Sequence, residues 1–447
     1  MTMVAAIGSR TAEAPLRSRT SRIAKIDIIS DLAHAEAVWR GLEAEASTPY
    51  QRFDFLAIWQ REVGARQKAQ PFIVAAYDNE GRPLLLMPLA LRQRLGVRVA
   101  SFMGDKHATF NMALWDKAFA SEAGASELAA LIAGIRERAA VDVMLLTQQP
   151  KRWRDMVNPF AVLPHQDSVN GCPVLNMNPG APPTALISSS FRSRLRSKER
   201  KLENLRGYRC HVADSDSEIT RLLDWFFLTK RLRMAEQRLP NVFADPVVEE
   251  FVRKACVKRL ANGKRAIDIH ALQCDEEVIA LFAGVADDDR FSMMFNTYTM
   301  SDHARYSPGL ILIRNIIDHY AAQGYRTLDL GIGSDEYKRM FCRDDEPIFD
   351  SVIPLSGRGK LASFAISATR RAKRWIKRNP ALLRLAHRCA AFFTSAWSAA
   401  RSFLLKKAAP LRPQRGRPTD PPREPFGDRA DKGLLGLKCN RTGGCII

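Results

Sequence analysis

Residues 304–331 read ARYSPGLILIRNIIDHYAAQGYRTLDLG, and this stretch carries the strongest structural signal in the chain. Ser307 is a favoured helix N-cap, and Pro308 suits the first helical position, where its missing N–H costs nothing. Apolar side chains then recur with helical spacing at Ile313, Ile316, Ile317 and Tyr320. Gly324 ends the predicted helix, and the following TLDLG predicts a strand.

Gly309 occupies the second position of this helix, where a helix alone has no need of it. Glycine costs roughly 1 kcal/mol relative to alanine inside a helix, and less in the first turn. A missing side chain lets a ligand approach the unpaired N–H groups at the positive end of the helix dipole. The stretch is therefore open to two interpretations, a plain helix start or a site for a phosphate.

Polar and ionisable residues gather where the following strand ends. Asp329 lies between Leu328 and Leu330, so its side chain points to the opposite face from theirs. The sequence then continues GIGSDEYK, and a glycine-rich strand end with charged groups is a common place for a site. The candidates for acid–base chemistry are Tyr298, Asp329, Asp335, Glu336, Tyr337 and Lys338.

The length and charge of the chain divide it into a folded body and a basic tail. With 447 residues, 46% apolar and 26% charged, it has core material for two or three domains. Of its 68 basic and 48 acidic residues, 21 basic and 4 acidic ones follow Leu355, so the tail holds +17 of the +20 net charge. The tail therefore favours an anionic partner, while the body is nearly neutral.

Two folded units with a similar order of elements precede the tail. The first, 24–165, reads as two helices, a hairpin with its turn at Asp78–Gly81, then strand, helix and strand. A proline-bearing linker is expected over Asn170–Pro183. The second unit, 184–355, begins with a basic helix (FRSRLRSKERKLENLRG) and continues with helices, three strands, the quoted helix, the strand at Thr327 and a short helix near Glu336. We predict an α+β fold of two tandem units, each with a mixed, largely antiparallel sheet flanked by helices.

The ends of the chain are expected to differ from its body. Residues 1–23 and 410–447 are predicted to be disordered, the latter because of its Pro/Arg-rich composition. Residues 356–409 read as two basic amphipathic helices. These favour contact with an anionic membrane surface, and the competing interpretation is a helix that packs on the body with a solvated basic face.

Cysteine usage and the absence of targeting signals favour the cytoplasm. The eight cysteines form no CxxC pair and no Cys/His ligand spacing, so no metal site is expected; they are Cys172, Cys210, Cys256, Cys274, Cys342, Cys389, Cys439 and Cys445. The first 25 residues lack an apolar signal segment, and no run approaches the ~20 apolar residues of a spanning helix. We expect a cytoplasmic protein, peripheral on the inner membrane face if the tail binds there.

The order RYSPG, helix, QGYRTLDLGIGSDEYKRMF resembles the GNAT acyltransferase superfamily. Within it, the chain is similar to the two-unit CelD-like branch linked to cellulose and exopolysaccharide biosynthesis, and distantly to Fem-type peptidyl transferases. The resemblance covers Ala33–Leu355 and is firmest over Ser188–Phe341, with PLLLMPLAL and RVASFMGD of the first unit in support. In this comparison the first unit is a degenerate copy.

The resemblance implies acetyl-CoA or another acyl-CoA in a splayed cleft of the sheet, its pyrophosphate on the N-terminus of the helix that opens at Pro308. The expected binding residues are Arg305, Ser307, Gly309, Leu310 and Ile311. The usual glycine-rich loop of the superfamily is reduced here to one glycine, which weakens the assignment of the donor. The basic helix could guide an anionic acceptor or the CoA 3′-phosphate, or be a solvated face.

The chemistry implied is attack of an amine or hydroxyl on a thioester, which needs a base for the nucleophile and an acid for the leaving thiolate. We prefer Asp329 or Glu336 as base and Tyr337 or Tyr298 as acid. Lys338 would hold an anionic substrate or the developing oxyanion. Each of these residues could instead be a surface charge or a tyrosine at the edge of the core.

Three functions remain open from sequence. The first is an acyl-CoA-dependent N- or O-acyltransferase acting on a small molecule or a cell-envelope or exopolysaccharide precursor. The second is Fem-like transfer from aminoacyl-tRNA, and the third is a non-catalytic scaffold at the membrane. The basic helix lacks interleaved aromatic residues, so a nucleic-acid partner is not expected.

Overall fold

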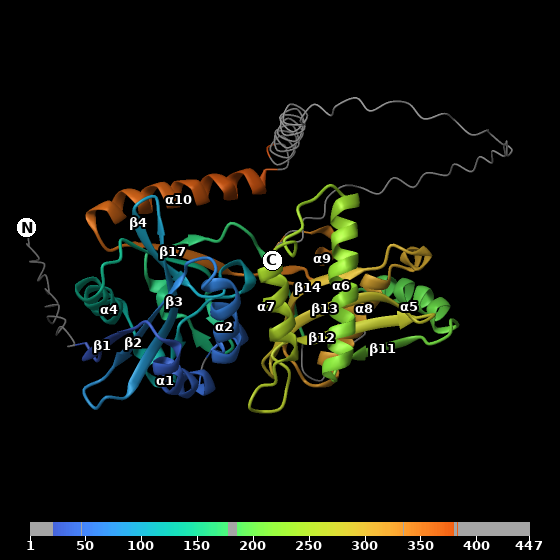
Figure 1. The fold of residues 1–447 in the computed structure, drawn as a ribbon, viewed down its shortest axis with the longest axis horizontal. Helices are drawn as coiled ribbons and strands as arrows, with labels where there is room; N and C mark the ends of the chain where they lie inside the picture. Colours follow the sequence, from blue (N-terminus) through green and yellow to red (C-terminus); the bar gives the residue numbers. More distant parts are fainter. Residues whose placement is uncertain (1–20, 46, 178–185, 334, 380–381, 383–447) are drawn as a thin grey trace, which may run out of the picture.

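The computed structural model describes residues 21–45, 47–177, 186–333, 335–379 and 382 (Figure 1). It contains two mixed β-sheets flanked by helices, which confirms the α+β class. The predicted second tail helix, the segment 410–447 and nearly all of the segment 1–23 lie outside the described residues. No helix in the described ranges has the length and apolar character needed to cross a membrane.

Eight strands form the first sheet. In spatial order they are β1 (Lys25–Ile29), β2 (Gln70–Tyr77), β3 (Pro83–Arg94), β4 (Val97–Phe102), β6 (Val143–Pro150), β17 (Ile348–Pro354) and β9 (Gln166–Asp167), with β5 (Leu114–Trp115) paired to β3. Neighbours are antiparallel except β4 and β6, which are parallel. A separate short ribbon joins β7 (Arg152–Trp153) and β8 (Met156–Val157).

The second sheet repeats this plan. In spatial order its strands are β11 (Arg209–Val212), β12 (Asp268–Cys274), β13 (Glu277–Ala286), β14 (Arg290–Tyr298), β15 (Thr327–Asp329), β10 (Cys172–Asn176) and β16 (Asp344–Glu346). The fourth and fifth strands, β14 and β15, again form the parallel pair. The matching position of the parallel pair supports the expected duplication.

The two sheets exchange one strand each. β10 precedes the second unit in sequence but pairs with β15 and β16 of the second sheet. β17 ends the second unit in sequence but lies between β6 and β9 of the first sheet. The expected linker Asn170–Pro183 is therefore wrong in its first part, because Cys172–Asn176 is a buried strand.

Helices cover both faces of the second sheet. The α-helices of both units, in the described ranges, are α1 (Leu32–Glu45), α2 (Phe53–Trp59), α3 (Lys117–Glu122), α4 (Ala125–Arg138), α5 (Ser189–Glu203), α6 (Asp216–Glu236), α7 (Pro246–Val257), α8 (Pro308–Ala322), α9 (Glu336–Arg339) and α10 (Gly357–Arg378). α5 and α8 pack on one face, where two ion pairs join them: Arg314–Glu199 at 2.6 Å and Arg192–Asp318 at 2.8 Å. α6 packs on the other face, and α7 lies beside it, against α2 of the first unit (Figure 1).

One hydrophobic core runs through both units. It joins Trp39 and Trp59 of the first unit to Phe251 and Phe295 of the second, all buried. A second core, on the opposite face of the second sheet, packs the apolar stripe of α8 that the sequence predicted. The two units therefore share one interior and are not separated by a solvated boundary.

Because each sheet holds a strand from the other half of the chain, we predict that the protein unfolds in one cooperative step. Unfolding either sheet removes the hydrogen bonds of a strand that the other half supplies. In calorimetry the described body should give one transition, with equal calorimetric and van't Hoff enthalpies. Two separated transitions would contradict this coupling.

Candidate functional site

The strands β14 and β15 run together briefly and then separate. They pair only from Arg290 opposite Thr327 to Ser292 opposite Asp329. β14 then continues to Tyr298, whereas the chain turns away from it at Gly331, with a φ of 72°. A Cβ on Gly331 would lie 2.7 Å from the Met293 carbonyl oxygen, so a side chain has no room there. The separation opens the sheet beside the N-terminal half of α8.

Asp329 lies at the point of separation and is fully buried. Its carboxylate accepts hydrogen bonds from Arg290 Nε at 2.8 Å, Ser292 Oγ at 3.0 Å and the Gly331 N–H at 2.9 Å. A base must be able to reach a substrate proton, and these oxygens are engaged and have no exposed atom. We therefore correct the preferred assignment of Asp329 as base and assign it to holding β14, β15 and the Gly331 turn together.

Arg290 extends the same network into the first unit. Its guanidinium also pairs with Glu346 at 2.7 Å and lies over the rings of Phe110 and Trp153, 4.4 and 4.8 Å from their centroids. Burial alone would lower the pKa of Arg290, but the carboxylates of Asp329 and Glu346 outweigh it and raise that pKa. The guanidinium therefore stays charged in a buried position.

Ser307 does not cap α8 in the expected way. It occupies the N-cap position but in the left-handed region, with φ 59° and ψ 52°, and its side chain makes no capping bond. Its hydroxyl instead accepts a hydrogen bond of 2.8 Å from Lys198 Nζ of α5. A non-glycine residue held in this region stores strain, which occurs most often at functional sites. Lys198 brings a positive charge to the start of the helix.

Among the N–H groups of Gly309, Leu310 and Ile311 at the start of α8, that of Gly309 is available to donate a hydrogen bond to a ligand. The N–H groups of Leu310 and Ile311 donate to the Ser307 carbonyl at 3.0 and 3.2 Å, so the expectation that they bind a phosphate is not met in this state. In the described part of the chain, no acceptor is found for the N–H of Gly309. A Cβ there would lie 3.4 Å from the Tyr298 ring, close but tolerable, so packing alone does not require glycine.

Aromatic and basic side chains surround this helix start. Tyr298 is 38% exposed, and the Arg233 guanidinium of α6 lies 3.5 Å from its ring centroid. Arg305 is exposed and stacks on its neighbour Tyr306. Three cations, Lys198, Arg233 and Arg305, therefore surround the N-terminus of α8.

A cleft of about 270 Å³ lies between the two units, where β14 and β15 separate. Its walls come from the first unit (Lys106–Thr109, Gln148, Ser168–Asn170), from the second (Met293, Met294, Asn296, Leu330–Ile332, Tyr337, Lys338, Ile348) and from α10 (Arg370, Lys373). Lysine and arginine occur among these described wall residues, and Asp and Glu do not. The cleft therefore favours an anionic ligand.

Lys338, Tyr337 and Glu336, which follow the Gly331 turn, differ from one another in burial and in contacts. Lys338 is buried, and its ammonium donates to the carbonyl oxygens of Gly331 and Ile332, both at 3.1 Å, so it holds this loop closed. Tyr337 lines the cleft, and its hydroxyl accepts a hydrogen bond of 3.3 Å from Asn296. Glu336 is exposed on the first turn of α9 and is not part of the cleft wall.

Asp335 lies beside Lys338, with 3.6 Å between its Oδ2 and the lysine Nζ. Burial raises the pKa of Asp335, and the neighbouring Lys338 opposes that rise. Its Oδ2 is buried and, in the described residues, accepts no hydrogen bond. A carboxylate with a raised pKa and spare acceptor capacity is suited to receive a proton.

His107 contributes a neutral donor from the first unit. It is buried, and its Nδ1 accepts a hydrogen bond of 3.1 Å from the Trp59 indole. Burial, with help from Lys106, lowers the pKa of His107 to about 4. The ring is therefore uncharged at neutral pH and carries its proton on Nε2.

His303 lies beside Asp275 and Cys274, near the start of α8. Its ring nitrogens lie 3.1 Å from Glu277 and 3.3 Å from Asp275. The side chains of Cys274, Asp275 and His303 place metal-ligating atoms within 4.8 Å of one another. The contacts tie the turn after β12 to the segment that leads into Ser307.

The structure brings the candidate residues together in two places. Tyr298 and Gly309 meet at the start of α8, and Tyr337 and Lys338 meet at the cleft. Sequence reasoning missed the contributions of the first unit and of α10, since their residues follow no motif and reach the cleft only through the exchanged strands. A positive φ at Gln148, at the cleft wall, had no sequence signal at all.

Comparison with known proteins assigns a family to the segment that contains α8 and the separating strands. Residues 189–339 match the family profile described as "Acetyltransferase (GNAT) domain". This segment contains α5 to α9 and is therefore a GNAT-type acetyltransferase domain. No curated protein matches the chain.

Solved structures with a related arrangement have low sequence identity to the chain. A structure of FemX is 9% identical, covering 71% of this chain and 99% of its own, with a TM-score of 0.48. The C-terminal domain of a putative lysylphosphatidylglycerol synthetase from Agrobacterium fabrum is 11% identical, covering 76% and 96%, at 0.44. A tandem GNAT protein from the clavulanic acid biosynthesis pathway is 11% identical, covering 74% and 99%, at 0.41.

We predict that Asp329→Asn destabilises the protein by about 3–5 kcal/mol, because it leaves the buried Arg290 charge without its main partner. Denaturant unfolding measures the change. The matched control is Asp289→Asn, whose partner Arg326 is half exposed, with an expected loss under about 1 kcal/mol. Full stability of Asp329→Asn would contradict the structural role.

Proposed function

We propose that this protein is an acyl-CoA-dependent N- or O-acyltransferase that acts, with acetyl-CoA as the preferred donor, on an anionic cell-envelope or exopolysaccharide precursor. The observation that carries the proposal is that β14 connects the N-terminus of α8 to the inter-unit cleft. Its last residue, Tyr298, packs on Gly309, and Met293, Met294 and Asn296 of the same strand line the cleft, so the strand defines a path between the two. No metal takes part in the proposed reaction.

The donor would enter along this path with its phosphates at the helix start. The N–H of Gly309 and the ammonium of Lys198 supply donors for the pyrophosphate, and Arg233 and Arg305 supply positive charge nearby. An extended pantetheine arm can then add its amides to the free edges of β14 and β15, where these strands no longer bond each other. Its thioester would end beside Asn296 and Tyr337.

The transfer step needs a base and an acid at that point. The acceptor's amine or hydroxyl attacks the thioester carbonyl carbon and loses its proton to Asp335. The C–S bond then breaks, and the Tyr337 hydroxyl protonates the departing thiolate. We prefer Asp335 over Glu336 because its carboxylate lies 3.6 Å from the ammonium of Lys338, which lines the cleft, and has a raised pKa, whereas Glu336 is exposed. Lys338 positions the loop that presents both groups.

The charge of the cleft supports the proposed acceptor class. Lys106, Arg370 and Lys373 reach it from the first unit and α10, and the described wall residues include no Asp or Glu. Phosphate or carboxylate groups of an envelope or polysaccharide precursor match this charge. The net charge of +17 after Leu355 supports a location at the inner face of the membrane.

We predict that Gly309→Glu abolishes acyl-CoA binding, because a carboxylate at the helix start repels the pyrophosphate and covers the N–H that would bind it. Titration calorimetry with acetyl-CoA should show a loss of at least about a hundredfold in affinity, on the order of 3 kcal/mol. Ala322→Glu is the matched control: it adds the same charge to the exposed last turn of the same helix. Equal affinities in both variants would contradict the donor site.

We predict that Asp335→Asn lowers the rate of CoA release in the presence of acceptor by about 10²–10⁴-fold with little effect on donor affinity. The base works only when deprotonated. Since burial raises the pKa of Asp335, the wild-type rate should fall as the pH drops through a value above the ordinary pKa of an aspartate. Asp345→Asn, at the exposed pair with Arg339, is the control. If the rate of the Asp335→Asn variant fell at low pH as the wild-type rate does, Asp335 would not be the base.

A further inference from the structure

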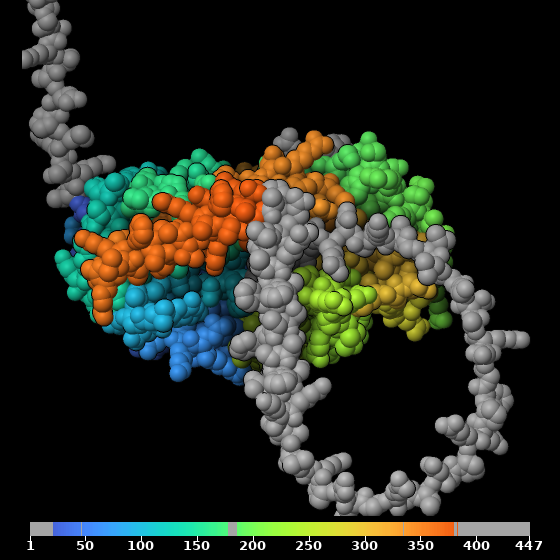
Figure 2. Space-filling model, turned by 90° about the horizontal axis from the view of Figure 1, so that it is seen from above, coloured from blue at the N-terminus to red at the C-terminus, as the bar shows by residue number. Residues whose placement is uncertain are grey.

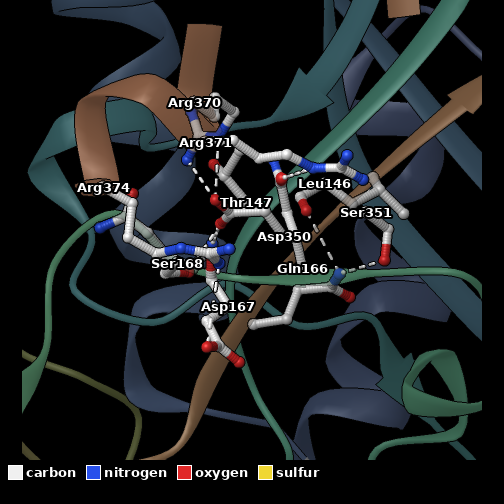
Figure 3. A network of polar contacts seen from close by, with 12 residues as sticks. Leu146, Thr147, Gln166, Asp167, Ser168, Asp350, Ser351, Arg370, Arg371 and Arg374 are labelled. Carbon is white, nitrogen blue, oxygen red and sulfur yellow. Dashed lines mark hydrogen bonds and ion pairs between the residues drawn. The ribbon is translucent and has the colours of Figure 1, made fainter. Parts of the chain in front are cut away.

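The inward face of α10 is polar, although the helix lies along the body. Arg370 donates to Asp350 at 2.6 and 2.8 Å, and this fully buried carboxylate also accepts from Ser168 Oγ at 2.6 Å (Figure 3). Farther along the helix, Arg374 donates to the backbone carbonyl of Asp167 at 2.7 Å. The helix is therefore attached to the first unit by hydrogen bonds and ion pairs.

The start of α10 packs closely through a glycine. A Cβ on Gly359 would lie 1.8 Å from the Asp142 carbonyl oxygen, so this turn touches the backbone at the beginning of β6. Ser356 caps the helix by accepting the Gly359 N–H at 3.0 Å. Gly359 and Ser363 are the buried residues of the helix, and neither is a large apolar side chain.

The apolar residues of α10 face away from the body. Leu361, Phe364 and Trp375 are 78%, 79% and 65% exposed. With the exposed alanines 365, 368 and 372 they recur at three- and four-residue intervals, so they form one stripe along the helix. An amphipathic helix on a soluble protein normally buries its apolar side, and here the sides are reversed.

Basic residues border this stripe on both sides. Arg358 and Lys373 lie on one side, and Lys360, Arg371 and Arg378 lie on the other, all exposed. The helix crosses the outer surface of the first unit, where Figure 2 shows it along its length. Apolar side chains flanked by Lys and Arg are the arrangement of helices that lie in the plane of an anionic bilayer surface.

We infer that the outward face of α10 binds an anionic lipid surface, with Leu361, Phe364 and Trp375 inserted among the acyl chains and the flanking cations on the headgroups. This extends the membrane location proposed above and does not depend on the acyl-transfer chemistry. The polar attachment to Asp350 and Asp167 holds the apolar stripe outward, as such an insertion requires.

Docking through α10 would bring the cleft to the membrane. Arg370 and Lys373 belong to the same helix and line the cleft between the units. The β3–β4 hairpin contacts α10, and its turn carries the fully exposed Leu95 between Arg94 and Arg98. An anionic acceptor held in the headgroup layer would therefore lie next to the cleft wall.

Flotation of the full chain with vesicles tests the inference. With phosphatidylglycerol/phosphatidylcholine vesicles the wild type should float, and with phosphatidylcholine alone binding should fall. The triple variant Leu361→Ser/Phe364→Ser/Trp375→Ser should lose binding to the anionic vesicles by on the order of tenfold or more. The control is Leu228→Ser/Leu232→Ser on α6, with 55% and 52% exposure, which should float like the wild type.

Oxidative footprinting of Trp375 separates a lipid from another occupant of the stripe. Trp375 should be oxidised readily without vesicles and protected when anionic vesicles are added. Protection without vesicles would mean that another part of the chain or a second copy covers the stripe, and it would overturn the inference. Flotation of the triple variant at the wild-type level would overturn it too. CoA affinity of the triple variant should be unchanged, so failure here is distinct from failure of the donor site.

Discussion

The buried pair of Arg290 and Asp329 is the interaction on which the rest of the structure depends. It joins β14 to β15 at the last point where they run together, and through Glu346 it includes the edge strand β16. Arg290 also lies against two aromatic rings of the first unit. A charge buried at such a junction is tolerated only when its partners are fixed, so the pair specifies how the two units and three strands meet.

The position of the cleft follows from this junction. Up to Asp329 the parallel strands bond each other, and beyond it the turn at Gly331 diverts the chain toward α9, leaving the edge of β14 open. The first unit closes the other side, because β10 and β17 exchange places and draw the two sheets together. A site of this kind needs both units, although the GNAT-type domain match lies in one.

Local features of the fold were readable from sequence, and long-range ones were not. The helix at Pro308 and the strand at Thr327 were predicted because their periodicity and end signals are local. The strand Cys172–Asn176 was hidden in a proline-bearing segment, and its partners lie more than 150 residues away. Asp329 was correctly placed facing away from its leucine neighbours, but its role depends on Arg290, which no spacing rule connects to it. Ser307 had the right residue type for a cap, and only the backbone angles reveal its strained conformation.

The tail shows the same limit. Composition identified α10 as basic and amphipathic, but the sequence could not say which side faces the body. The answer lies in Arg370 and Gly359, which form the packed side of the helix in place of its larger apolar residues.

The central claim is that a donor runs from the start of α8 into the inter-unit cleft. A crystal structure of the protein soaked with CoA tests it most directly. The account predicts the pyrophosphate at Gly309 and Lys198, with the pantetheine arm between β14 and β15 and its thiol beside Tyr337. CoA bound elsewhere, or no bound CoA at saturating concentration, would contradict it.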